Sequence, residues 1–187
     1  MGKSRAGGAK LDENGLEQAA LRYLERYSSS VAGLRRVLRR RIRRAARMSE
    51  GDEKRSDVAA GDAMIETVLR RMTKSGLLDD ARYAEFRAGS LSRRGGSLYV
   101  IRRDLMTRGV ASPLIDAALE ALKRETGAES SDETDLAAAL ALAKRRRLGP
   151  FRAPTVRAAL RMRDLAALGR AGFAFEIAKK VIDGEAE

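Results

Sequence analysis

Glycines at intervals along residues 76–110 limit where helices in this chain can end. Gly76 and Gly109 each follow apolar residues spaced for one face of a helix, so each suits the position after a helix, where the backbone takes a positive φ. The pair Gly95 and Gly96 interrupts the pattern between them. We therefore expect two short helices in this stretch, each bounded by turn residues.

Two adjacent aspartates, Asp79 and Asp80, begin the first of these helices. A carboxylate at a helix start accepts hydrogen bonds from the first N–H groups and interacts favourably with the helix dipole. A catalytic carboxylate pair is the alternative, but capping is far commoner for acids at a helix start. Asp79 or Asp80 is therefore predicted to cap this helix. The helix is also predicted to place Tyr83 and Ala84 on its buried face.

A similar order of helices and turns recurs along the chain. Apolar pairs mark a middle helix three times, at Leu34 and Leu38, Ile101 and Leu105, and Leu165 and Leu168. Units of this size are too small to be stable alone, so neighbours must stack. We predict an all-α fold, an elongated curved array of three tandem three-helix repeats.

The repeats set the predicted domain boundaries. Residues 1–12 are expected to be a disordered basic tail, 13–76 the first three-helix repeat, 77–126 the second and 127–187 the third. The first repeat is expected to contain a flexible insertion near 48–60, because that segment is polar and charged. Its third helix is expected to start at about Asp62.

Charge and composition narrow the range of functions. The chain has 38 Lys and Arg against 26 Asp and Glu, a net charge of +12, which favours a polyanionic partner: nucleic acid, a nucleoprotein or an anionic membrane face. Cysteine and histidine are absent, which removes thiolate chemistry, the usual zinc ligands and every serine-histidine triad. We expect no cofactor, no catalysis, no membrane segment and a cytoplasmic location.

Arginines dominate the segment that follows Leu34, where they surround an apolar stripe of Val37, Leu38 and Ile42. The guanidinium group binds phosphate in a bidentate manner, so such a helix suits contact with a nucleic-acid backbone. A plain solvated face is the second interpretation. Docking on anionic lipid is the third, and the helix lacks the Trp or Phe that would anchor it there.

Two segments resemble the RecX family, small bacterial proteins that regulate the RecA recombinase. LLDDARYA is similar to the first family motif and IRRDLMTRGV to the second. The matching residues are Leu78, Asp79, Asp80, Arg82, Tyr83 and Ala84, then Ile101, Arg102, Asp104, Leu105, Arg108, Gly109 and Val110. The chain departs at Ser97, Leu98 and Val100, where the family has glycine, proline and arginine.

The resemblance implies tandem three-helix repeats and a regulator that binds RecA filaments on single-stranded DNA. It implies inhibition of filament extension, ATP hydrolysis and strand exchange, and hence modulation of DNA repair and the SOS response. The expected partners are the RecA filament and single-stranded DNA, bound directly or through the filament, with the chain acting as a monomer. The predicted contact residues are Arg35, Arg36, Arg39, Arg40, Arg43, Arg82, Arg102, Arg103 and Arg108.

Two other classes of function remain open at this point. The alternative function is that of a sequence-specific transcription regulator, in which the helix pair from Asp80 to Arg108 would act as a helix-turn-helix. Its second helix has no Asn or Gln for reading adenine. A general helical scaffold or membrane-surface protein is the remaining class.

Overall fold

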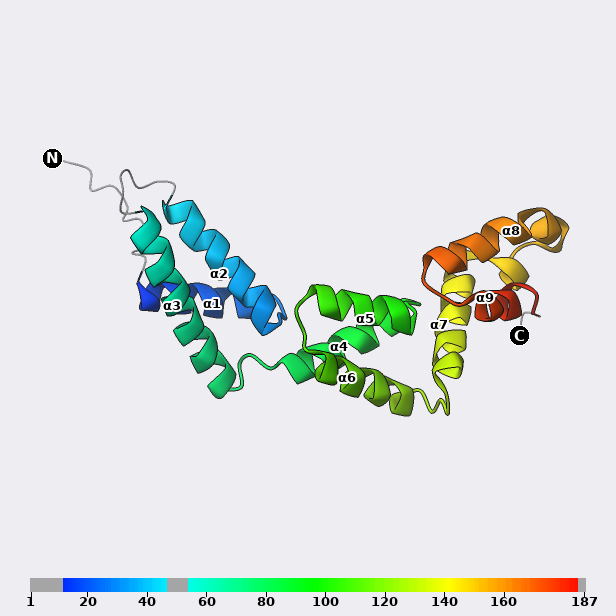
Figure 1. Cartoon of the computed structure of the whole chain (residues 1–187). Coiled ribbons are helices and arrows are strands. Elements are labelled where there is room, and N and C mark those ends of the chain that lie inside the picture. Colours follow the sequence, from blue (N-terminus) through cyan, green and yellow to red (C-terminus); the bar gives the residue numbers. More distant parts are fainter. Residues whose placement is uncertain (1–11, 47–53, 185–187) are drawn as a thin grey trace. The chain divides into compact units, whose positions relative to one another are not determined.

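The computed structural model describes residues 12–46 and 54–184 (Figure 1). These residues form nine α-helices and a short 3-10 helix, and none of them lies in a strand. The helices are α1 (Glu13–Leu24), α2 (Val31–Ala46), α3 (Lys54–Lys74), α4 (Asp80–Arg93), α5 (Leu98–Thr107), α6 (Ser112–Glu125), α7 (Ser131–Arg146), η1 (Gly149–Phe151), α8 (Pro154–Arg170) and α9 (Phe175–Ile182). The predicted all-α repeat fold is confirmed, with the helices grouped in threes.

The chain divides into two compact units, residues 1–83 and 84–187, with the boundary inside α4. In the first unit, α1, α2 and α3 enclose one apolar core. Its buried members include Leu16, Leu34, Leu38, Ile42, Ile65, Val68, Leu69 and Met72, together with Leu78 from the segment before α4. The apolar stripe of α2 predicted from its spacing therefore faces α1 and α3.

The second unit contains the rest of the chain. The core of its last helical group is formed by α7, α8 and α9, with Ala139, Leu142, Leu168 and Val181 among its buried residues. In the preceding group, Ile101 and Leu105 of α5 are fully buried, as are Ala84 of α4 and Ile115 of α6. The three predicted middle helices are therefore α2, α5 and α8.

The predicted segment boundaries need two corrections. The basic tail predicted at 1–12 lies outside the described residues except Asp12, whose carboxylate accepts a hydrogen bond from Gly15 N–H and caps α1. The flexible insertion predicted near 48–60 lies partly outside them, at 47–53. Its second part is wrong, because α3 begins at Lys54 and is helical well before Asp62.

The early start of α3 has a physical basis in its sequence. Alanine has the highest helix propensity, and Ala59 and Ala60 precede Gly61. Helices α2 and α3 lie close together at Gly61. A Cβ at this position would lie only 2.7 Å from Cδ1 of Ile42 in α2. Close packing of α3 against α2 thus favours a continuous helix at Gly61, although glycine in a local sequence pattern usually indicates a helix break.

The helix ends predicted at Gly76 and Gly109 are confirmed, and α8 also ends at a glycine, Gly172. Gly76, Gly109 and Gly172 have φ of 74°, 78° and 86°. After α5, Val110 N–H donates to the carbonyl of Leu105 at 3.1 Å, and after α8 the equivalent bond joins Phe173 to Leu168 at 3.3 Å. These bonds are those of the Schellman motif, so the two helices end in the same way.

Asp79 and Asp80 have separate roles. Asp79 accepts from the backbone N–H groups of Ala81 and Arg82 at 2.9 and 3.1 Å, and so caps α4. Asp80 instead accepts from the N–H of Val31, the first residue of α2, at 2.8 Å. The capping prediction is confirmed, and one of the two carboxylates caps a helix distant in sequence.

A similar contact recurs at α5, and we call each such contact, from an aspartate to the first N–H of a middle helix, a joint. Asp135 of α7 accepts from the N–H of Leu98, the first residue of α5, at 2.7 Å. A buried serine precedes the middle helix in both cases, and the Ser30 and Ser97 hydroxyls accept from the N–H groups of Gly33 and Val100. Each joint links the start of a middle helix to an aspartate of the first helix that follows its group.

The third middle helix has no donor at the corresponding place. It begins with Pro154, which has no N–H to satisfy. A helix that starts with proline therefore needs no acid from another helix at this position.

Candidate interaction surfaces on the middle helices

The arginines of α2 fall into distinct sets around the helix. Arg35 donates to both carboxylate oxygens of Glu66 in α3, at 2.7 and 2.9 Å, and Arg39 donates to Asp62 at 2.9 Å. The hydrogen bond from Arg35 lowers the pKa of Glu66. These two predicted contact residues therefore pair α2 with α3.

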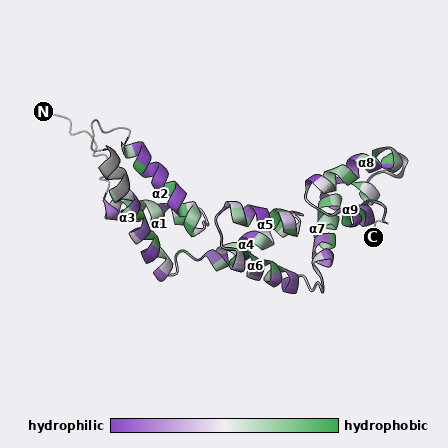
Figure 2. Ribbon diagram, viewed as in Figure 1, coloured by the Kyte–Doolittle hydropathy of each residue, from purple (hydrophilic) through white to green (hydrophobic). Residues whose placement is uncertain are grey.

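A second set points away from the core on the exposed side of α2. Its members, here called the α2 ridge, are Arg36, Arg40, Arg43 and Arg44. Within residues 12–46 and 54–184, no ion pair involves Arg40, Arg43 or Arg44. Figure 2 shows hydrophilic, purple stretches along this helix. Three members of the α2 ridge, Arg40, Arg43 and Arg44, thus hold exposed guanidinium groups without an ion-pair partner among the described residues.

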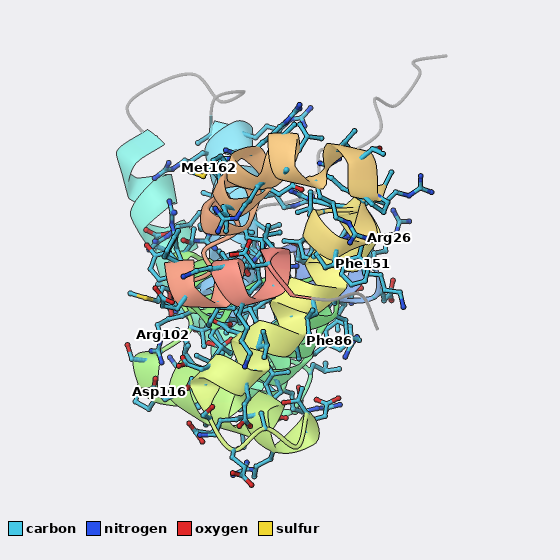
Figure 3. All side chains as sticks on the ribbon, turned by 90° about the vertical axis from the view of Figure 1, so that its right-hand side faces the viewer. Arg26, Phe86, Arg102, Asp116, Phe151 and Met162 are labelled. Atoms are coloured by element: carbon cyan, nitrogen blue, oxygen red, sulfur yellow. The ribbon has the colours of Figure 1, made fainter. Side chains whose placement is uncertain are left out.

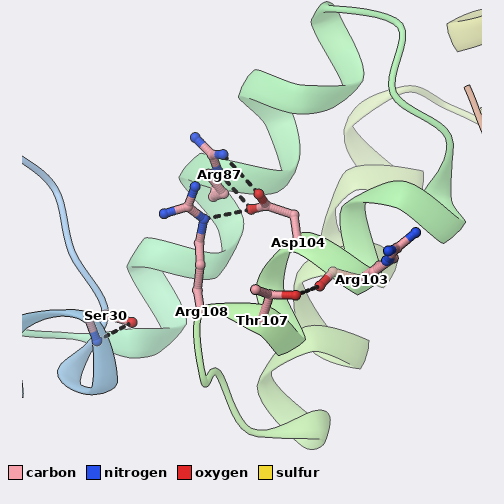
Figure 4. Close-up of polar contacts among 7 residues, drawn as sticks. Ser30, Arg87, Arg103, Asp104, Thr107 and Arg108 are labelled. Atoms are coloured by element: carbon pink, nitrogen blue, oxygen red, sulfur yellow. Dashed lines mark hydrogen bonds and ion pairs between the residues drawn. The ribbon is translucent and has the colours of Figure 1, made fainter. Parts of the chain in front are cut away.

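The polar residues of α5 are also divided between its sides. On one side, Arg87 of α4 binds Asp104 through two hydrogen bonds at 2.9 and 3.0 Å, and Arg108 adds a third at 2.9 Å (Figure 4). The bonds from Arg87 lower the pKa of Asp104 most, burial opposes this effect, and the bond from Arg108 lowers the pKa further. Arg108 is therefore part of a structural cluster.

On the other side of α5, Arg102 donates to Asp116 of α6 at 2.6 Å (Figure 3). Both side chains remain about half exposed, so the pair is open to water and contributes little to stability. Arg102 is thus held in place by a partner that water can replace.

Between these two sides, three exposed residues form what we call the α5 ridge: Tyr99, Arg103 and Met106. Tyr99 and Met106 are 62% and 58% exposed. The Arg103 side chain points away from the Asp104 cluster in Figure 4 and has no ion-pair partner among the described residues. The α5 ridge is an exposed surface that mixes aromatic, apolar and cationic groups.

A groove lies beside Tyr99 and Arg102, between α5, α6 and α7. It measures about 470 Å³ and is also lined by Leu98, Asp116, Leu119, Glu120, Lys123, Ser131 and Asp135. Lys123 and Glu120 form an ion pair at 3.2 Å on its wall. The groove therefore presents both signs of charge.

The structure separates the nine predicted contact residues. Arg35, Arg39, Arg102 and Arg108 are in ion pairs. Arg40, Arg43, Arg82 and Arg103 are exposed and have no such partner among the described residues, and Arg36 is exposed on the α2 ridge. Arg82 lies at the start of α4, in the first compact unit.

Sequence reasoning missed the ridge residues Arg44, Tyr99 and Met106 as a set, and it missed Arg87. The spacing of 99, 103 and 106 matches one helical face, so the α5 ridge was detectable once the buried face was assigned. The ion pair between Arg87 and Asp104 was not detectable in this way, because it joins two different helices, α4 and α5.

The described part of the chain offers no group of three or more acidic side chains suited to hold a metal ion. No helix within it is long and apolar enough to cross a membrane. The described surfaces carry exposed arginine forks on α2, a group whose geometry suits phosphate, and a mixed polar and apolar face on α5.

Comparison with known proteins identifies relatives. A family model described as RecX, second three-helix domain, matches residues 79–119. Regulatory protein RecX of Myxococcus xanthus (strain DK1622) is 38% identical over 98% of this chain and 98% of its own length. The protein of the same description from Agrobacterium fabrum is 33% identical over 56% of this chain and 51% of its own. No solved structure matches the chain.

Proposed function

The chain belongs to the RecX family, and from that premise we propose that it is a non-enzymatic regulator that binds RecA filaments on single-stranded DNA and inhibits the recombinase. Inhibition acts on filament extension, and through it on ATP hydrolysis and strand exchange. The consequence in the cell is restraint of recombinational DNA repair and of the SOS response.

The observation that carries the nucleic-acid part of this proposal is the α2 ridge. Arginines that neutralise phosphates release counterions, and this release favours binding at low salt. Arg40, Arg43 and Arg44 have no acidic partner among the described residues. Phosphate binding at these three arginines therefore does not first have to break an ion pair within the protein. Arg35 and Arg39, which do have partners, hold α2 against α3 and set the direction of the ridge.

The test is ATP hydrolysis by RecA on single-stranded DNA, titrated with this protein from far below one copy per recombinase and repeated at two salt concentrations. We expect inhibition at a low ratio, because a regulator of filament extension acts on the assembly rather than on each subunit. We also expect weaker inhibition at the higher salt. Hydrolysis that stays unchanged at every ratio would contradict the proposal.

The helix-turn-helix alternative has less support. In that motif the N-terminal residues of the second helix contact base edges. Here Leu98 N–H is bonded to Asp135, and Ser97 is buried and donates to the carbonyl of Ala171. A strong preference for one duplex sequence over random DNA would nevertheless favour a transcription regulator over the filament inhibitor.

A further inference from the structure

The α5 ridge differs in chemistry from the α2 ridge. Tyr99 and Met106 expose most of their side chains to water, with Arg103 between them on the same face. Tyrosine, methionine and arginine are the residues enriched at protein interfaces, and tyrosine and arginine are frequent among those that dominate binding energy. The α2 ridge, by contrast, carries only arginine.

The groove beside the α5 ridge disfavours a polyanion. Asp116 and Glu120 stand on its wall with their side chains more than half exposed, next to Arg102 and Lys123. Phosphates along a nucleic-acid strand would meet these carboxylates at close range and would be repelled. A polypeptide can place a cation against the acids and an anion against the arginines.

The surroundings of the ridge also hold it in a fixed position. Leu98 N–H is bonded to Asp135 and Ser97 is buried at the start of α5, while Asp104 ties the far end of the helix to Arg87. A surface on a rigid helix loses little conformational freedom on binding. The three exposed side chains are therefore preorganised for a partner.

We propose that the α5 ridge and the adjoining groove dock a protein segment of the recombinase, one that presents an apolar side chain flanked by residues of both charge signs. This inference rests on the proposed function, and it assigns protein recognition to α5 and phosphate contact to α2. Tyr99 and Met106 supply the apolar contact, Arg103 and Arg102 meet the acid of the segment, and Asp116 and Glu120 meet its base.

The experiment compares the double variant Tyr99→Ala, Met106→Ala with a matched control, Met162→Ala, Phe175→Ala. The control also removes one methionine and one aromatic ring, from residues that are 70% and 62% exposed on α8 and α9. Two affinities are measured by fluorescence anisotropy: for recombinase filaments assembled on single-stranded DNA with a non-hydrolysable ATP analogue, and for the same DNA without recombinase. Circular dichroism checks that helicity is unchanged.

We expect the α5 variant to bind filaments about tenfold more weakly or worse, with DNA affinity within about twofold of wild type and the control unaffected. Filament affinity equal to that of wild type would overturn the docking surface. Loss of affinity for DNA alone would also overturn it, since Tyr99 would then be a platform for stacked bases. Wild-type protein that neither binds nor inhibits filaments would instead overturn the proposed function.

Discussion

The buried carboxylate of Asp164 shows what single acids do in this arginine-rich chain. It is 1% exposed, and it accepts two hydrogen bonds from Arg152 at 2.6 and 2.8 Å and one from Gly149 N–H at 2.8 Å. Burial opposes the charged form, but these bonds outweigh it and lower the pKa of Asp164. The carboxylate thereby fixes the turn between α7 and α8.

We predict that Asp164→Asn lowers the free energy of unfolding at pH 7 by about 2–4 kcal/mol, because it leaves Arg152 without a charged partner and removes acceptor capacity at a buried site. Urea unfolding followed by circular dichroism measures the change. The exposed neighbour Arg163→Gln is the control and should change stability by less than about 0.5 kcal/mol. An Asp164 variant as stable as this control would contradict the assigned role.

Asp135 should behave differently, because burial raises its pKa more than the hydrogen bond from Leu98 N–H lowers it. An asparagine oxygen can accept the same bond without a buried charge. We therefore expect Asp135→Asn to match or slightly exceed wild-type stability at pH 7, and Asp135→Ala to lose about 1 kcal/mol by leaving the N–H unpaired. Equal losses in both variants would show that the charge itself is needed.

The opposite pKa shifts of these two acids predict opposite pH effects. A lowered pKa, as for Asp164, gives stability that is present above the unfolded-state pKa of about 4 and is lost as pH falls through the folded-state value. A raised pKa, as for Asp135, gives stability that is present in acid and is lost as pH rises through the folded-state value. Any advantage of Asp135→Asn over wild type should thus shrink between pH 7 and pH 4. Urea unfolding at both values tests this, and an advantage that grows in acid would contradict the sign.

At the scale of the helix, glycine ends serve two purposes that φ alone does not distinguish. Gly76 and Gly95 have φ of 74° and 71°. A Cβ at Gly76 meets nothing within 4 Å, whereas one at Gly95 would lie 2.6 Å from Cβ of Leu142 and 3.0 Å from the carbonyl oxygen of Ala138. Gly95 therefore lets the end of α4 pack directly on α7.

We predict that Gly76→Ala lowers the free energy of unfolding by about 1–2 kcal/mol, the cost of a left-handed backbone for a residue with a Cβ. Gly95→Ala should lose about 1–3 kcal/mol more, since backbone atoms of α7 must also move. Thermal and urea unfolding of the pair measure the difference. Equal losses would mean that close packing at Gly95 is unimportant.

The two arginine sets of α2 should also separate by measurement. Arg40→Ala, Arg43→Ala and Arg44→Ala combined should weaken binding to single-stranded DNA and reduce the slope of log K against log salt by about 2, or about 0.7 for each phosphate that is no longer neutralised. The combined control Arg35→Ala, Arg39→Ala removes two arginines that pair with α3 and should change that slope by much less. Equal changes in both variants would place phosphate binding on the whole helix.

Local patterns predicted helix ends well and contacts between distant residues poorly. The glycine stops and the capping role of Asp79 follow from neighbouring residues, so the sequence was sufficient. The bond from Val31 to Asp80 and that from Leu98 to Asp135 join helices far apart in sequence, and no local pattern marks them. For the same reason the predicted contact residues included Arg35 and Arg39, whose acidic partners lie on another helix.

For the whole chain, the two joints give each compact unit its own long-range contact. The bond of Asp80 lies within residues 1–83 and that of Asp135 within 84–187. In repeat proteins, stability is close to a sum of repeat terms and neighbour terms, so loss of one joint affects only the groups that it connects. The two units should accordingly open independently.

Native-state hydrogen exchange of the full chain tests this independence. Asp80→Ala should speed exchange of the Val31 amide and of α2, while the amides of α7 to α9 keep their wild-type rates. Asp135→Ala should speed exchange at Leu98 and along α5, while α1 to α3 remain unchanged. Asp132→Ala, an exposed acid in the first turn of α7, is the control and should leave Val31 and Leu98 as in wild type. Faster exchange of all helices in either joint variant would mean that the chain opens as a single cooperative body, because removal of one neighbour term would then lower the stability of every helix together.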